Sequence, residues 1–138
     1  MTIESVVMAS GRPASAPNLR WVLGLDAATC LAMGMLLVAG AAPLAGLLAL
    51  PQALLLWAGI VLFPCAALMA CTAALLRPLL VWLVVLGNAA WVIGSLGVLL
   101  ALQPNALGIG FVLVQAAVVV GLLVLEHRGL AALGWRAR

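Results

Sequence analysis

Residues Leu79–Leu102 read LLVWLVVLGNAAWVIGSLGVLLAL, an uncharged and mostly aliphatic segment. A helix rises 1.5 Å per residue, so this segment is long enough to cross the ~30 Å hydrocarbon core of a bilayer. The aliphatic run is interrupted near its middle by Gly87, Asn88, Trp91, Gly94 and Ser95. We therefore expect a transmembrane helix that carries polar and small residues at mid-depth.

The composition of the whole chain extends this expectation to a polytopic membrane protein. Of its 138 residues, 68% are hydrophobic and only 7% are charged, a composition that no soluble domain of this size could cover with polar groups. Uncharged runs of about 20 residues must satisfy their backbone groups internally in lipid, so they are expected to be helices. The sequence predicts an all-α fold with four transmembrane helices in an antiparallel bundle.

The expected transmembrane domain covers residues 19–125. Within it we expect helices over residues 19–39, 52–76, 79–102 and 106–125. Two tight turns separate the later helices, one at Arg77-Pro78 and one at Gln103-Pro104-Asn105, because proline starts a helix well and disfavours helix before it. Residues 40–51 are expected to form an apolar connection. Residues 1–18 are expected to form an N-terminal tail and residues 126–138 a basic C-terminal tail.

The arginines predict the orientation of the chain in the membrane. With four crossings, both termini and the Arg77 turn lie on one side, and that side holds all six basic residues of the chain: Arg12, Arg20, Arg77, Arg128, Arg136 and Arg138. By the positive-inside rule both termini are cytoplasmic, and the net charge of +3 is a topology signal and not a sign of nucleic-acid binding. The absence of lysine and tyrosine is typical of a GC-rich bacterial genome, so we expect a multi-pass protein of the bacterial inner membrane.

A faint internal repeat accompanies this layout. The segment Leu25-Asp26-Ala27-Ala28 of the first expected helix is echoed by Gly87-Asn88-Ala89-Ala90 of the third. These helices point the same way, so the pattern predicts a parallel repeat of two hairpins. Chance similarity in a chain rich in Ala, Leu and Gly is the alternative explanation.

Several polar or backbone-disrupting residues are expected at similar depth. Counted from the helix ends, the residues near the midplane are Thr29, Cys30, Pro64, Asn88 and Gln115, and Trp91 lies one turn from Asn88. One interpretation is structural: Asn88 and Gln115 pair across helices, and the carbonyl that Pro64 leaves free accepts a neighbouring donor. The other is functional: the layer lines a pocket for a partly polar, lipid-like ligand.

Asp26 is the most informative single residue, because it lies ~9 Å inside Arg20 and an ionisable group within a span is costly. One interpretation pairs it with Arg77 or Arg128 at the cytoplasmic rim. The other makes it a proton-coupling or cation-binding carboxylate. The segment Glu126-His127-Arg128 is interpreted as a solvated helix end.

No motif in the sequence names a reaction. It contains no nucleophile and base pair, P-loop, nucleotide-binding glycine motif or metal-ligand cluster, and its three cysteines are interpreted as small buried hydrophobic residues. We therefore predict no catalytic residue, no metal and no cofactor, and the sequence does not support an enzyme.

Leu25-Asp26, the mid-helix Pro64, the Arg77 turn and Gly87-Asn88-Ala89-Ala90-Trp91 resemble the layout of small, uncharacterised four-helix integral membrane proteins of proteobacteria. The resemblance covers about Arg20 to Arg128 and implies the four-span fold, with no activity. The leading hypothesis is an inner-membrane protein that packs with itself or a partner subunit and holds a hydrophobic ligand in the midplane layer. The alternative is a small transporter or channel subunit that uses Asp26 for proton or cation coupling.

Overall fold

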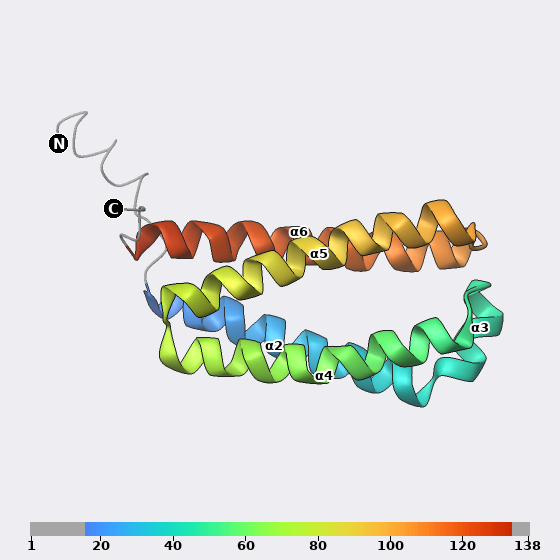
Figure 1. Ribbon diagram of the computed structural model, residues 1–138, viewed down its shortest axis with the longest axis horizontal. Helices are drawn as coiled ribbons and strands as arrows, with labels where there is room; N and C mark the ends of the chain where they lie inside the picture. Colours follow the sequence, from blue (N-terminus) through green and yellow to red (C-terminus); the bar gives the residue numbers. More distant parts are fainter. Residues whose placement is uncertain (1–15, 134–138) are drawn as a thin grey trace, which may run out of the picture.

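The computed structural model describes residues 16–133, and this part of the chain is almost entirely helical. Most of the expected N-terminal tail, at residues 1–15, and the end of the expected C-terminal tail, at residues 134–138, lie outside this range. The helices, shown in Figure 1, are α2 (Ala16–Ala39), α3 (Ala41–Leu48), α4 (Gln52–Leu75), α5 (Pro78–Leu102) and α6 (Ala106–Ala132).

Four of these helices, α2, α4, α5 and α6, are long and apolar enough to cross a membrane. This confirms the four long apolar helices that hydropathy and the resemblance predict. Large apolar side chains cover the outside of the bundle, as lipid surroundings require, and among the most exposed are Trp21, Trp57, Leu79, Ile93 and Leu100.

Two boundaries differ from the sequence-based expectation. The connection over residues 40–51 contains the short helix α3. Helix α6 does not end at Leu125 but continues to Ala132, so Glu126, His127 and Arg128 belong to the helix. The expected end was set by the first charged residues, but charge alone does not end a helix that has neither proline nor a terminating glycine conformation at that point.

Local chemistry explains where α5 and α6 begin. Helix α5 has Pro78 in its first turn, after Arg77 in an extended conformation, so the missing proline N–H costs no helical hydrogen bond. Helix α6 is capped by Asn105, whose side-chain oxygen accepts a 2.9 Å hydrogen bond from the Gly108 N–H. The amide nitrogen of Asn105 also donates to the carbonyl of Leu47, which ties the start of α6 to α3.

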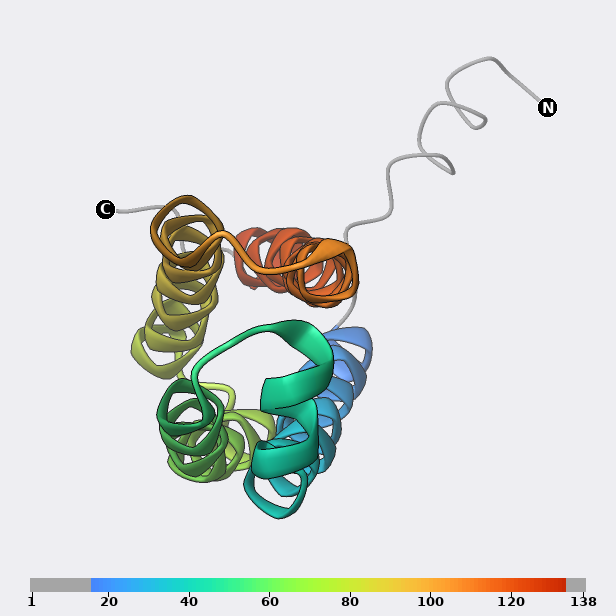
Figure 2. The ribbon, with the colours of Figure 1, turned by 90° about the vertical axis from the view of Figure 1, so that its right-hand side faces the viewer.

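The long helices form two pairs, α2 with α4 and α5 with α6. The contact between the two pairs is less extensive than the contact within each pair. Figure 2 shows the two pairs end-on, with α3 at the near end of the space between them. The α2–α4 pair is close because glycines face each other: a Cβ on Gly59 would lie 3.0 Å from the Gly34 carbonyl oxygen and 2.9 Å from the Leu37 side chain. Small residues that permit such approach are the usual basis of helix association in lipid.

Two apolar clusters hold the pairs together at opposite ends of the bundle. The first joins all four long helices and consists of Leu19, Leu23, Met69, Val81, Val84, Val85 and Leu130. The second consists of Leu37, Ala41, Leu48, Leu50, Leu55, Leu62 and Val112. Val81, Val84 and Val85 of α5 belong to the first cluster, but no buried residue of the second cluster comes from α5. Helix α5 is therefore well packed near its start and less enclosed toward its end.

Replacing Gly59 by Leu should separate α2 from α4. The new side chain meets the Leu37 side chain and the Gly34 backbone, so we expect a loss of about 1–3 kcal/mol in the free energy of unfolding. The measurement is SDS-induced unfolding in mild-detergent micelles. Gly97→Leu on α5 is the matched control, because a Cβ there meets nothing within 4 Å; equal losses in the two variants would contradict close α2–α4 packing.

Candidate functional site

The centre of the site is a single amide that links three helices. The Asn88 Nδ2 of α5 donates a 2.9 Å hydrogen bond to Asp26 Oδ2 of α2 and a 3.0 Å hydrogen bond to Glu126 Oε2 of α6. All three side chains are buried, with exposed fractions of 1% for Asp26, 4% for Asn88 and 0% for Glu126. Both hydrogens of the amide are therefore used, and two carboxyl groups meet at one nitrogen.

The remaining carboxyl oxygens have few donors. The Cys30 thiol is 3.8 Å from Asp26 Oδ1, which is a weak contact. Glu126 Oε1 is buried and accepts no hydrogen bond from any residue in the described part of the chain. Thr29 does not contribute a donor, because its hydroxyl bonds to the backbone carbonyl of Asp26, 2.9 Å away. The cluster thus holds more acceptors than donors in an apolar surrounding.

This arrangement corrects two predicted pairings. Asp26 is not paired with Arg77 or Arg128, since both arginines are exposed and Asp26 is hydrogen-bonded to Asn88. Asn88 is not paired with Gln115: both of its donor hydrogens go to carboxyl groups, and no hydrogen bond between Asn88 and Gln115 is present in the described part of the chain. Helix α5 crosses the bundle obliquely in Figure 1, so residues at different distances from their helix ends meet.

Beside the cluster lies an elongated cavity of about 680 Å³ between the two helix pairs. Its α6 lining extends from Ala106 to Leu122, ~24 Å along the helix axis. Asp26 and Asn88 line one part of it, and Leu47 and Leu48 of α3 line another. Most of the remaining wall is aliphatic, so the cavity has an apolar body and a small polar region.

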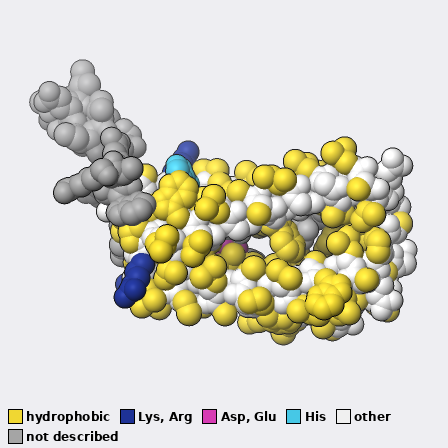
Figure 3. Space-filling model, in the orientation of Figure 1, with side chains coloured by type: hydrophobic (Ala, Val, Ile, Leu, Met, Phe, Trp, Pro, Cys, Tyr) yellow, Lys and Arg dark blue, Asp and Glu magenta, His cyan; other side chains and the backbone are white. Residues whose placement is uncertain are grey.

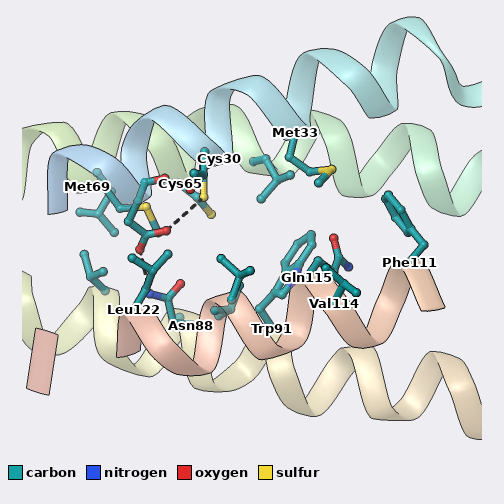
Figure 4. Close-up of a pocket in the computed structure, with 18 of the residues that line it drawn as sticks. Cys30, Met33, Cys65, Met69, Asn88, Trp91, Phe111, Val114, Gln115 and Leu122 are labelled. Atoms are coloured by element: carbon teal, nitrogen blue, oxygen red, sulfur yellow. Dashed lines mark hydrogen bonds between the residues drawn. The ribbon is translucent and has the colours of Figure 1, made fainter. Parts of the chain in front are cut away.

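Figure 4 shows how side chains from both pairs face this cavity. Four sulfur-containing residues project from the α2–α4 side, namely Cys30, Met33, Cys65 and Met69. Trp91, Phe111 and Gln115 project from the α5–α6 side. Thioethers and aromatic rings are polarisable and adapt to irregular apolar shapes, so these walls suit an apolar guest.

The structure brings together most of the residues that the sequence singled out. Thr29, Cys30, Asn88, Trp91 and Gln115 all line the cavity, together with Asp26. Pro64 does not: it is exposed on α4 and absent from the lining, where its neighbour Cys65 stands instead. Depth along a helix placed Pro64 in the same layer, but its rotation about the α4 axis turns it outward.

Glu126 is the residue that the sequence interpretation missed. It was expected in a solvated helix end, whereas it is the most buried charged residue among residues 16–133. A signal was present, because Leu122, Glu126, Gly129 and Leu130 follow i, i+4, i+7 and i+8 and form one buried face of α6. Continuing the apolar face past Leu125 would have placed Glu126 inward.

Two of the three cysteines line the cavity: Cys30 and Cys65 are half-buried, while Cys71 is exposed. Among residues 16–133, no three His, Cys, Asp or Glu side chains are grouped so that they could hold a metal ion. What this geometry offers chemically is a set of hydrogen-bond acceptors at the edge of an apolar cavity.

Comparison with protein families, with curated proteins and with solved structures gives no match for this chain.

The shared amide predicts energetic coupling between Asn88 and Glu126. Asn88→Leu removes the only donor to Glu126 among the described residues, so it should destabilise the wild type more than a Glu126→Leu background. We expect a coupling energy of about 1–2 kcal/mol in a double-mutant cycle followed by SDS-induced unfolding. Asn88→Leu and Gln115→Leu should instead be additive to within about 0.5 kcal/mol. Stronger coupling to Gln115 than to Glu126 would refute the observed pairing.

Proposed function

We propose that this chain is a small multi-pass protein of the bacterial inner membrane that holds a hydrophobic ligand between its two helix pairs. The observation that carries the proposal is the apolar cavity of about 680 Å³, with Asp26 and Asn88 at its polar part. Pockets for small organic ligands have volumes of about 300–1,000 Å³, mostly apolar walls and a few polar groups that fix orientation. The cavity has these three properties.

The distribution of charge supports an antiparallel bundle with both chain ends in the cytoplasm. The beginning of α2, the α4–α5 turn and the end of α6 lie at the same end of the bundle (Figure 1). Arg20, Arg77 and Arg128 belong to these segments and are exposed. Basic side chains gather at this end in Figure 3 as well. The positive-inside rule assigns such an end to the cytoplasm.

Two further parts of the proposal concern assembly and ancestry. The exposed apolar surface suits either lipid or contact with a second membrane subunit, including another copy of this chain. The pairing of α2 with α4 and of α5 with α6 gives two hairpins that are consecutive in the chain, an arrangement that supports the proposed parallel repeat.

Filling the cavity from within should abolish ligand binding. Gly110 lines the cavity and a Cβ there meets nothing within 4 Å, so a Gly110→Phe side chain begins in open space and its ring would occupy part of the cavity. We expect native mass spectrometry of the gently extracted wild type to show a co-purified apolar molecule, and the variant to have lost it. Gly121→Phe is the control, because Gly121 is equally open and lies outside the lining. An equal adduct on all three proteins would contradict the proposal.

A second candidate function is proton or cation coupling through Asp26. The specific observation in its favour is that Asp26 and Glu126 accept hydrogen bonds from one amide, which holds two carboxyl groups close together inside the bundle. Two neighbouring carboxylates repel each other, so a proton or a small cation shared between them would relieve that repulsion.

Liposome flux separates this candidate from ligand holding. If Asp26 couples protons, wild-type protein should dissipate an imposed pH gradient, followed with an internal pH-sensitive dye, and Asp26→Asn should reduce the rate by at least about tenfold, or 1.4 kcal/mol. Arg77→Gln, which changes an exposed charge in the α4–α5 turn, should leave the rate unchanged. No flux above empty liposomes, or equal flux in wild type and Asp26→Asn, would exclude the coupling function.

A further inference from the structure

The carboxyl group of Asp26, at the polar part of the cavity, has one oxygen without a strong hydrogen-bond donor. Both hydrogens of the Asn88 amide are donated to Asp26 Oδ2 and Glu126 Oε2, and Asp26 Oδ1 has only the Cys30 thiol, 3.8 Å away. Glu126 Oε1 also has no donor among residues 16–133, but Glu126 lies behind the cavity lining and is not part of it. Carboxylate oxygens can each accept more than one hydrogen bond, and unfilled acceptors are costly in an apolar site. A guest that fits here therefore supplies N–H or O–H donors.

The same region also lacks positive charge. The arginines in the described part of the chain, Arg20, Arg77 and Arg128, are all exposed, and none forms an ion pair with Asp26 or Glu126. His127 follows Glu126 but is exposed and packs edge-on against Trp82, with 6.0 Å between ring centroids. Charge complementarity therefore favours a cationic donor over a neutral one and disfavours an anion.

An aromatic ring stands next to this acidic region. Trp91 is half-buried, lines the cavity and lies one helical turn from Asn88 on the same face of α5. The face of an indole attracts a cation, and more strongly when water is excluded. A carboxyl group and an indole ring line one mostly apolar cavity, and both groups attract a protonated amine.

The cavity is also open to the side. Figure 3 shows a hollow between α5 and α4, and acidic side-chain atoms are visible at one end of it. The weak enclosure of α5 toward its end, where no fully buried residue joins the second apolar cluster, leaves this gap. Leu83 of α5 lines the cavity and its side chain is also exposed, so the opening faces lipid and admits an amphiphile already dissolved in the bilayer.

We propose that the ligand is a lipophilic amine: an apolar chain or ring body that fills the cavity, and a protonated amino group that donates to Asp26 beside Trp91. This inference rests on the proposed function, and it adds the chemical class of the ligand and its lateral entry between α4 and α5. The amino group supplies the donor that Asp26 Oδ1 lacks and the positive charge that is missing from the polar part of the cavity.

Three probes of equal chain length test it: dodecylamine, dodecanol and dodecanoic acid. Each is titrated into the full-length protein in lipid nanodiscs, and the bound fraction is counted by native mass spectrometry after release. We expect dodecylamine to bind at least about tenfold more tightly than dodecanol, and dodecanoic acid to bind more weakly than dodecanol. In Asp26→Asn, the affinity for dodecylamine should fall to within about threefold of the affinity for dodecanol. In Arg20→Gln, the preference for dodecylamine over dodecanol should be preserved.

A second variant keeps the test valid if Asp26→Asn does not fold. Trp91→Leu retains an apolar wall but removes the indole ring. It should therefore lower the affinity for dodecylamine by about threefold or more and change the affinity for dodecanol by less than about twofold. Equal binding of all three probes would overturn the amine class while leaving a hydrophobic ligand site in place. Failure of every probe to bind would overturn the proposed function as well. An amine preference unaffected by both Asp26→Asn and Trp91→Leu would place the amine elsewhere and overturn the inference.

Discussion

The packing of the helices depends on the buried amide group of Asn88, whose hydrogen bonds to two carboxyl groups are shielded from water. Inside a lipid-exposed bundle, a carboxyl group on one helix is tolerated only if neighbouring helices supply its partners. Asn88 is that partner for both Asp26 and Glu126, so the register of α2, α5 and α6 is set by two hydrogen bonds from a single nitrogen. Helix α4 takes no part in these bonds and is positioned instead by its close glycine contact with α2 at Gly34 and Gly59.

These two modes of association explain why the bundle is not uniformly packed. The glycines Gly34 and Gly59 let α2 and α4 approach closely, while the amide bridge holds α5 and α6 to α2 mainly near one end. Because α5 crosses obliquely, it leaves α4 as it approaches the other end (Figure 1). The cavity is the space that remains between the pairs. Both proposed functions use its polar part, one for the head of a ligand and the other for a proton or cation.

Much of the candidate site could be predicted from the sequence, but only as a set of separate residues. Asp26 and Asn88 were conspicuous because polar groups inside a span are costly, and Trp91 and Gln115 followed from depth along the helices. Depth says nothing about rotation, so Pro64 was placed in a layer from which it faces away. Glu126 was missed because the helix was expected to end at Leu125, which places Glu126 in solvent. Helix α6 in fact continues past Glu126 to Ala132.

The sequence by itself determined that this chain has four apolar helices of membrane-spanning length, and it located the α4–α5 and α5–α6 turns closely. Length, hydropathy and proline placement act within one helix at a time, so they can be read along the chain. Only the tertiary structure decided that Asn88 serves Asp26 and Glu126, and that a cavity opens beside them. Those features depend on the tilt and rotation of each helix, and these are set by packing between residues far apart in sequence.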